Sequence, residues 1–361
     1  MLRLKVTIRD VAREAGVSVA TVSRVLNDSG PVSDAARARI LEIAGRLRYA
    51  PNEAARTLIS SRTSALGVIL PDLHGEFFSE VIRGLDQAAK ASGFHLLVSG
   101  SHNDAAETDA ALRAMRGRVD GLVVMATDAR TADVASGIPD GVPVVLLNCP
   151  PVDGRAHSIE IDNYGGAYAM VRHLAGPARR RVAVITGTPN NRDAAERLRG
   201  YREAVRDLEV EQSAEWELGG NFTEASGYEA ARRFLALPHR PEALFASNDS
   251  MAIGALSALR EAGVRVPEDV AVGGFDDIPM ARYTSPPLTS VRVPMGELGA
   301  RAVRRLVLAV GTEGNQPTRR ETLPTSLIVR ASCGGPNDKN QGMTDAVALG
   351  VEPRGRRSPE L

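Results

Sequence analysis

Residues 6–27 read VTIRDVAREAGVSVATVSRVLN, and this stretch predicts two short helices joined by a tight turn. Thr7 suits an N-cap, with Asp10 three residues on to accept a hydrogen bond from its amide in a capping box. Gly16 suits the end of the first helix, and Ser18 suits the cap of the second. Helical spacing gives both helices an apolar side, made of Ile8, Val11, Ala12 and Ala15 in the first and of Val19, Val22, Val25 and Leu26 in the second.

The opposite side of the second helix carries small polar groups and one guanidinium, from Ser18, Thr21, Ser23, Arg24 and Asn27. In a helix-turn-helix unit the second helix enters the major groove of DNA. Hydroxyl groups there suit phosphate contacts, and Arg24 can fork onto a guanine edge. Val19 and Ala20 can touch thymine methyl groups but cannot read a base pair by hydrogen bonding. An ordinary helical hairpin with a solvated face is the alternative on this pattern alone.

A third helix follows in GPVSDAARARILEIAGRLRYAPNEAARTL, with Ser33 as its cap and an inward side of Ile40, Ile43, Ala44 and Leu47. The run resembles the headpiece and hinge of the lactose/galactose repressor (LacI/GalR) family. The matching strings are TIRDVAREAGVSVATVSRVLN, VSDAARARI and YAPNEAARTL, in the family's order and spacing, and the resemblance extends to about Cys333. It implies an all-α headpiece over residues 1–50 and a hinge over residues 51–63.

The resemblance also implies further contacts with DNA. The expected set adds Thr7 and the hinge residues Asn52, Ala55, Arg56 and Leu58 to those of the second helix. A segment as short as residues 52–58 is below the roughly 12–15 residues that an isolated helix needs, so we expect it to form only where two copies pair on DNA. Leu58 then resembles the family's apolar wedge, which enters the minor groove and bends the duplex.

Charge is divided unevenly along the chain of 361 residues, whose formal net charge is zero. Residues 1–63 carry eleven Lys and Arg against six Asp and Glu, a balance of +5, and residues 64–330 carry twenty-nine against thirty-four, a balance of −5. A basic N-terminal part suits salt-dependent phosphate contacts. The length favours two or three folding units.

From Ala65 onward, short apolar runs alternate with helical patterns. The runs are LGVIL (66–70), HLLVS (95–99), GLVVM (121–125), VPVVLL (142–147), RVAVITG (181–187), a segment near Trp216, ALFAS (243–247), VAVGGF (270–275) and PLTSVRV (287–293). Helices are expected near 77–91, 105–117, 194–208, 224–237, 251–262 and 295–310. Strands that are apolar throughout indicate parallel sheets covered on both faces. The body is therefore expected to be α/β, with one doubly wound pattern occurring twice.

Such sheets bind ligands beyond the carboxyl ends of their strands. The residues there are polar and include Asp72, Asn103, Asp104, Thr127, Asp128, Asn148, residues 191–197, Asn248, Asp249, Asp276 and Asp277, with Phe77, Phe78 and Phe222 nearby. This mixture suits a hydroxyl-rich or heterocyclic molecule. The alternative is that the same residues only cap helices, as we expect of Asp104 and Asp249.

The resemblance implies a body like a periplasmic sugar-binding protein, in which three crossover segments link two α/β subdomains around an effector cleft. The effector and dimerisation domain would span residues 64–335, with one subdomain at about 64–161 and 292–325 and the other at about 162–291 and 326–335. Arg197 in RLRGY, Phe222 in GGNFTEASGY, Asn248 in FASNDSMAIGAL and Asp276 in VGGFDDIPMARYTSPPLTSV match the family's effector contacts. Asp72, Phe78 and Asn148 lie in loops that match more loosely. Arg197 and Asp276 would hold hydroxyl or carboxylate groups, although a purely structural ion pair is the alternative for either.

No pattern points to catalysis, a metal or a cofactor. Cys149 and Cys333 have no His partner at a recognisable spacing and make no disulfide framework. We expect a cytoplasmic DNA-binding transcriptional regulator, a repressor whose operator affinity a small polar effector such as a sugar controls. A solute-binding receptor of transport and an enzyme with a DNA-binding head are the alternatives, and the absence of an export signal speaks against the receptor. Residues 336–361 are expected to be disordered. Some members of the resembled family end in a leucine-heptad helix that joins dimers into tetramers; that pattern is missing here, so the resemblance implies a homodimer.

Overall fold

The computed structural model describes residues 6–26, 29–49, 62–127, 137–138, 141–149, 156–176, 179–311 and 319–335. The chain forms two compact units, Met1–Thr63 and Ser64–Leu361. Several predictions lie outside the described residues. These are the roles of Asn27, of Asp128 and of the hinge residues Asn52, Ala55, Arg56 and Leu58, together with the disordered tail over residues 336–361.

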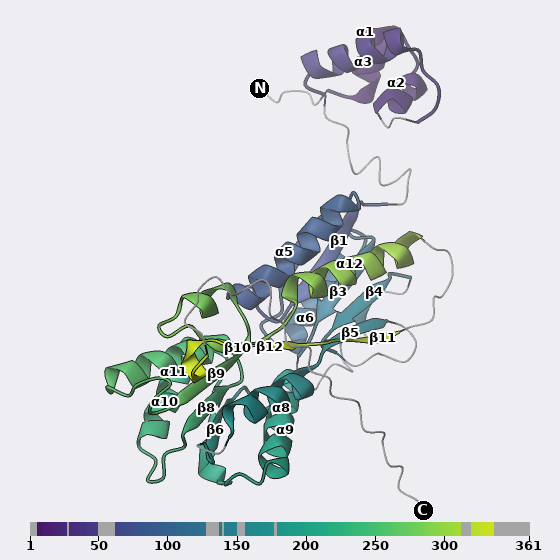
Figure 1. The fold of residues 1–361 in the computed structure, drawn as a ribbon. Coiled ribbons are helices and arrows are strands. Elements are labelled where there is room, and N and C mark those ends of the chain that lie inside the picture. The colour runs from purple at the N-terminus through teal and green to yellow at the C-terminus, as the bar shows by residue number, and fades with distance from the viewer. Residues whose placement is uncertain are drawn as a thin grey trace, which may run out of the picture. The chain divides into compact units, whose positions relative to one another are not determined.

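The headpiece consists of α1 (Ile8–Ala15), α2 (Val19–Leu26) and α3 (Asp34–Arg46) (Figure 1). The capping box is confirmed, because the Asp10 carboxylate accepts from the Thr7 amide at 2.9 Å. Gly16 ends α1 with a left-handed φ of 64°, as predicted. Ser18 and Ser33 also cap as predicted, accepting from Thr21 N at 3.2 Å and from Ala36 N at 3.4 Å.

A small apolar core joins the three helices. Its buried members are Val11, Ala12, Ala15, Val22, Val25, Ile40, Ile43 and Ala44. One assignment was wrong, because Val19 is 41% exposed and does not belong to the apolar side of α2. At about 100° per residue Val19 lies some 120° around the helix from Val25, and it is also the first residue of α2. The sequence analysis placed Val19 on the apolar side because valine is apolar, although its position around the helix does not coincide with that side.

The body contains two six-stranded sheets. The first has the order β11-β5-β4-β3-β1-β2, all parallel, and is built from β1 (Ala65–Leu70), β2 (His95–Gly100), β3 (Gly121–Met125), β4 (Val144–Leu147), β5 (His157–Ile161) and β11 (Arg320–Leu323). Its helices are α5 (Glu76–Ala91), α6 (Ala105–Met115) and α12 (Met295–Gly311), and α5 packs along α12 (Figure 1).

The second sheet has the order β12-β10-β9-β8-β6-β7. Its strands are β6 (Val182–Thr186), β7 (Glu217–Gly219), β8 (Ala243–Ala246), β9 (Ala271–Asp276), β10 (Thr289–Arg292) and β12 (Ser326–Ile328), of which β12 alone runs antiparallel to its neighbour. Its helices pack in pairs, α8 (Asn163–Leu174) with α9 (Arg192–Asp207) and α10 (Glu224–Leu235) with α11 (Asp249–Glu261). Short 3-10 helices lie at Ala214–Trp216, Pro279–Tyr283 and Ala331–Cys333.

The chain passes between the two sheets three times. It leaves the first sheet after β5, returns after β10 to form α12 and β11, and crosses again between β11 and β12. The doubly wound α/β body with two parallel-dominated sheets is thus confirmed. No helix within the described ranges is long and apolar enough to cross a bilayer.

The sequence pattern failed at several elements of the body, and it indicated neither β11 nor β12. It missed β5 and α8, where HSIEI mixes polar and apolar residues and Gly and Tyr interrupt the helical apolar period. It also predicted a strand buried on both faces at residues 95–99. The structure instead leaves β2 largely exposed, with Leu97 41% and Val98 38% accessible, because β2 lies at the edge of its sheet.

Close packing of α10 on α11 generates a stability prediction. A Cβ atom on Gly254 would lie 1.9 Å from the Glu224 carbonyl oxygen, so Gly254→Ala must push the two helices apart. Such overpacking costs about 1–3 kcal/mol. Urea unfolding should show this loss. Gly296→Ala in α12 is the control, because its Cβ would meet nothing within 4 Å, and it should be neutral or slightly stabilising. Equal stability of the two variants would contradict the packing argument.

Candidate functional site

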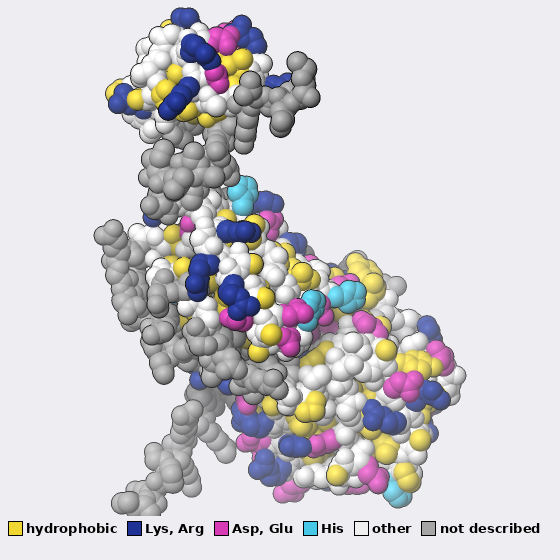
Figure 2. Space-filling view, turned by 180° about the vertical axis from the view of Figure 1, so that it is seen from behind, with side chains coloured by type: hydrophobic (Ala, Val, Ile, Leu, Met, Phe, Trp, Pro, Cys, Tyr) yellow, Lys and Arg dark blue, Asp and Glu magenta, His cyan; other side chains and the backbone are white. Residues whose placement is uncertain are grey.

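The outer surface of α2 is the first candidate site. Ser18, Val19, Ala20 and Arg24 are exposed there, and Thr21 and Ser23 are half-buried. The Ser18 and Thr21 hydroxyls lie 2.9 Å apart, so these two groups sit together at the start of the helix. Arg side chains are spread over the described headpiece surface (Figure 2). The arrangement presents a short helix with an accessible guanidinium, as a major-groove reader requires.

Thr7 lies on the same headpiece and is exposed. Its hydroxyl donates to the Asp10 carboxylate at 2.7 Å. The pKa of Asp10 is lowered, first by the hydrogen bond from the Thr7 side chain. Thr7 thus fixes the start of α1, and a phosphate contact from its hydroxyl would have to compete with Asp10.

The second candidate site is a cavity of about 240 Å³ in the body. It lies where loops follow the carboxyl ends of strands in both sheets, the position expected for α/β folds. Six of the seven predicted effector residues line it, namely Asp72, Phe78, Arg197, Phe222, Asn248 and Asp276. Phe77, Asn103, Thr127 and Asn191, which the strand-end pattern also indicated, line it as well.

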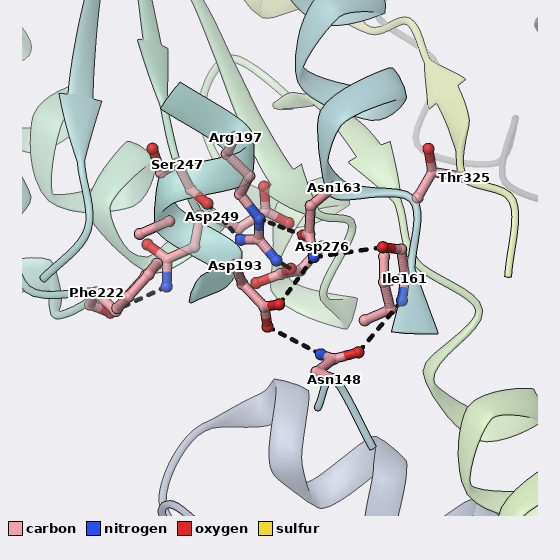
Figure 3. Close-up of polar contacts among 12 residues, drawn as sticks. Asn148, Ile161, Asn163, Asp193, Arg197, Phe222, Ser247, Asp249, Asp276 and Thr325 are labelled. Carbon is pink, nitrogen blue, oxygen red and sulfur yellow. Dashed lines mark hydrogen bonds and ion pairs between the residues drawn. The ribbon is translucent and has the colours of Figure 1, made fainter. Parts of the chain in front are cut away.

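Arg197 on α9 forms the best-connected part of the cavity wall (Figure 3). It is 4% exposed. Its Nε donates to Asn163 Oδ1 at 2.8 Å, Nη1 to the Ser247 carbonyl at 2.5 Å, and Nη2 to Asp276 Oδ1 at 3.2 Å. The guanidinium carbon also lies 3.8 Å from the centre of the Phe275 ring, within cation–π range. These contacts hold the guanidinium plane in one orientation.

Asp276 ends β9 and faces Arg197 (Figure 3). It has a φ of 103°, a backbone conformation that costs a non-glycine residue free energy and that clusters at functional sites. Burial raises its pKa to about 7, and the Arg197 charge acts in the opposite direction. Burial likewise raises the pKa of Asp193, with Arg197 again opposing. The cavity therefore contains one carboxyl group, that of Asp276, whose charge changes near neutral pH.

Asn148 is the predicted effector residue that does not line the cavity. It is 2% exposed, and its Nδ2 donates to Asp193 at 2.9 Å while its Oδ1 accepts from the Ile161 amide at 3.2 Å. Its amide is thus engaged on both sides, so the geometry offers it no direct ligand contact. Because Asn148 follows β4 and Asp193 lies on α9, the bond joins the two halves of the body.

Two further contacts cross between the halves. The Arg192 amide donates to the Thr127 carbonyl at 2.8 Å, and the Met280 amide donates to Glu76 Oε2 at 2.8 Å. Each of these contacts and of the Asn148–Asp193 bond involves one residue that lines the cavity, namely Thr127, Glu76 and Asp193. Small changes at the cavity can therefore alter how the halves are joined.

An aromatic side chain closes another part of the cavity. Phe222 has a φ of 70°, and its carbonyl accepts from Asn248 Nδ2 at 3.0 Å. A Cβ at Gly187 would lie 2.1 Å from the Phe222 ring, so only glycine allows the ring to sit there.

Asn248 also caps α11 by accepting from Met251 N at 2.9 Å. The prediction that Asp249 caps a helix was wrong, because its carboxylate accepts instead from the Ile278 amide and the Ser290 hydroxyl. Asp104 does cap α6, as expected.

The sequence pattern missed Asn163. Its Nδ2 donates to Asp193 Oδ1 at 2.9 Å while its Oδ1 accepts from Arg197, so it aligns both charged groups. The signal was present, because Asp162 and Asn163 follow β5 as polar residues follow the other strands. It was overlooked because β5 itself was not recognised. Among the described residues no group of three or more His, Cys, Asp or Glu is placed to bind a metal ion.

A helix-turn-helix unit joined to a two-sheet body with a polar cavity defines the class of ligand-responsive DNA-binding regulators. Two family descriptions match the chain. "Bacterial regulatory proteins, lacI family" matches residues 7–52, and "Periplasmic binding protein-like domain" matches residues 171–333.

Relatives match over almost the whole length. The ribose operon repressor of Escherichia coli (strain K12) is 34% identical over 329 residues, covering 90% of this chain and 99% of the relative. The HTH-type transcriptional repressor PurR of Mannheimia succiniciproducens is 31% identical over 331 residues, covering 90% and 98%. The chain therefore belongs to the lacI family of bacterial regulatory proteins and is a DNA-binding transcriptional regulator, which confirms the family resemblance.

Solved structures agree. The lac repressor dimer bound to operator and the anti-inducer ONPF has a TM-score of 0.81 at 28% identity, covering 91% of this chain and 99% of that one. The complex of the transcriptional regulator CelR with cellobiose has a TM-score of 0.68 at 32% identity, with the same coverage.

Asp276 generates a pH prediction. With its pKa raised to about 7 in the folded chain, it binds a proton that the unfolded chain has lost above about pH 4. Stability should therefore fall as pH rises from about 4 to 7. Asp276→Asn removes this contribution, so thermal unfolding of the variant should lose less stability over that interval. Parallel curves for variant and parent would show that Asp276 ionises normally.

Proposed function

We propose that the protein is a repressor that binds double-stranded operator DNA as a homodimer and responds to a small polar effector, such as a sugar, bound in the cavity. The observation that carries this proposal is the buried Arg197–Asp276 pair, which lines the cavity while the chain also carries a helix-turn-helix headpiece. Relatives named as repressors support the first part, and the cellobiose complex supports a sugar as effector. The dimer of the lac repressor structure supports the homodimer.

Operator reading is assigned to the exposed side of α2. Arg24 is the base-reading candidate, Ser18, Thr21 and Ser23 are candidates for phosphate contacts, and Val19 and Ala20 suit thymine methyl groups. The 41% exposure of Val19 supports its part in this set. Because operator DNA is cytoplasmic, we place the protein in the cytoplasm.

Effector binding is assigned to Asp72, Phe78, Arg197, Phe222, Asn248 and Asp276. Carboxylate, amide and guanidinium groups can bind the hydroxyls of a sugar, and Phe222 and Phe78 can pack on its apolar faces. Asn148 is reassigned to positioning Asp193. The cavity is a binding site without catalysis, and the headpiece speaks against a transport receptor.

Communication between cavity and DNA is assigned to the contacts that cross between the halves. A ligand that binds near Asp193 and Glu76 would change the Asn148–Asp193 and Glu76–Met280 bonds and so shift one half against the other. Coupling of about 1–3 kcal/mol is typical of allosteric pairs, so the effector should change operator affinity by 5- to 150-fold.

Arg24→Ala tests the reading surface. If Arg24 forks onto a guanine, its loss should cost about 1–3 kcal/mol at one base pair of each half-site. Titration of the parent operator and of single-base variants measures this. Arg39→Ala on α3 makes the same charge change away from α2 and should weaken binding equally for all operator variants. An Arg24→Ala variant that keeps the full base preference would remove Arg24 from the reading role.

Arg197→Lys tests the effector site. Lysine keeps the charge but loses the planar fork, so the response of operator binding to the effector should be lost while the variant without effector still binds DNA. Arg199→Lys is the control, because Arg199 is a neighbour on α9 whose side chain is 54% exposed. Fluorescence anisotropy with labelled operator measures both. A full effector response in Arg197→Lys would make the arginine structural only.

A further inference from the structure

The cavity is surrounded by the starts of four helices. Their N-cap residues, Gly75 of α5, Asn191 of α9, Thr223 of α10 and Asn248 of α11, all line it. A helix N-terminus offers free amides and a positive dipole end, and both favour an anion. By backbone geometry alone the cavity would suit a phosphate or carboxylate ligand.

A cap side chain already accepts from one backbone amide at each of three of these helix starts. Asn191 accepts from Ala194 N at 2.9 Å, and Asn248 accepts from Met251 N at 2.9 Å. Thr223 accepts from Ser226 N at 3.2 Å. An incoming anion would have to displace these caps to reach those amides.

Acidic residues stand in the first turns of the same helices. Glu76 of α5, Asp193 of α9 and Glu224 of α10 each line the cavity. Their carboxylates have neutral donors as partners: Glu76 accepts from Met280 N at 2.8 Å, Glu224 from the Ser250 hydroxyl at 2.6 Å, and Asp193 from two asparagine amides. The negative charge that each helix dipole favours is thus supplied by the chain itself.

The arginine of the cavity does not reverse this balance. Among the described residues, five acidic side chains and one arginine line it, and Arg197 already pairs with Asp276. Even without counting Asp193 and Asp276, whose pKa values are raised, Asp72, Glu76 and Glu224 face one guanidinium. An added phosphate would meet like charge, which costs several kcal/mol at close range.

We propose that the cavity selects an uncharged polyhydroxy compound of about one ring and excludes its phosphorylated and carboxylated analogues, with Glu76 and Glu224 as the excluding residues. The proposal rests on the proposed function, which makes the cavity the effector site. Its volume of about 240 Å³ lies below the roughly 300–1,000 Å³ of sites for drug-sized ligands, and this sets the limit on size.

Hydroxyl groups fit the cavity better than a cation does. Arg197 donates to described residues through Nε, Nη1 and Nη2, using three of its five N–H groups, so two can donate to a ligand oxygen. The carboxylates can accept from the same hydroxyls. A cationic ligand would satisfy the carboxylates but would face the Arg197 guanidinium at the cavity wall.

Calorimetry on the full-length protein without DNA tests the proposal. The probes are D-ribose and D-glucose, their 5- and 6-phosphates, D-glucuronate, D-glucosamine and inorganic phosphate. We expect a neutral sugar to bind and its phosphate to bind at least about 100-fold more weakly, since several kcal/mol correspond to two or more factors of ten. The parent should give no saturable heat with inorganic phosphate.

The double variant Glu76→Gln/Glu224→Gln keeps the size of both side chains and should gain saturable phosphate binding. Glu229→Gln on α10 is the control, because Glu229 has a side chain that is 63% exposed and does not line the cavity, and it should gain none. Saturable binding of phosphate or of a sugar phosphate by the parent would overturn the proposal, as would preferred binding of D-glucosamine or a double variant that gains nothing. Failure of the proposed function would look different, as a ligand that binds but leaves operator affinity unchanged.

Discussion

The Arg197–Asp276 ion pair is the interaction on which the body depends, because it places two charges in the interior of a protein. Such charges cost several kcal/mol each to remove from water, and the cost is offset only where every remaining donor and acceptor is engaged. Asn163, the Ser247 carbonyl and the Phe275 ring meet part of this requirement around the guanidinium, and two of its N–H groups are left for a ligand. Their elements, α8, the loop after β8, and β9, are therefore held in one arrangement at the cavity.

Backbone strain concentrates around the same pair. Asn148, Phe222 and Asp276 have φ values of 53°, 70° and 103°, which L-residues adopt only when the surroundings determine them. Asn148 follows β4, Asp276 ends β9, and Phe222 lies two residues before the start of α10. The contacts between the two halves, through Asn148–Asp193 and Glu76–Met280, lie beside these positions. A molecule bound in the cavity can thus contact residues of both halves.

The sequence predicted the architecture well because its strongest signals are local. Caps such as Thr7 and Ser33, and apolar runs such as Gly121–Met125, determine elements from neighbouring residues alone. Six of the seven predicted effector residues also line one cavity, since parallel strands end at the same edge of a sheet. The differences between pattern and structure arose where tertiary position decides. Leu97 and Val98 are exposed because β2 is at an edge, and Asn148 is engaged by Asp193, a partner 45 residues away. No local pattern contains that information.

A double-mutant cycle measures the central interaction most directly. Parent, Arg197→Met, Asp276→Asn and the double variant would be unfolded in urea at pH 8, above the pKa of about 7 of Asp276. If the pair is the constraint described above, the double variant should lose less free energy of unfolding than the two single variants lose together. The difference should be about 1–3 kcal/mol. Losses that add to within about 0.5 kcal/mol would mean that the two charges do not depend on each other. The organisation of the cavity would then need another cause.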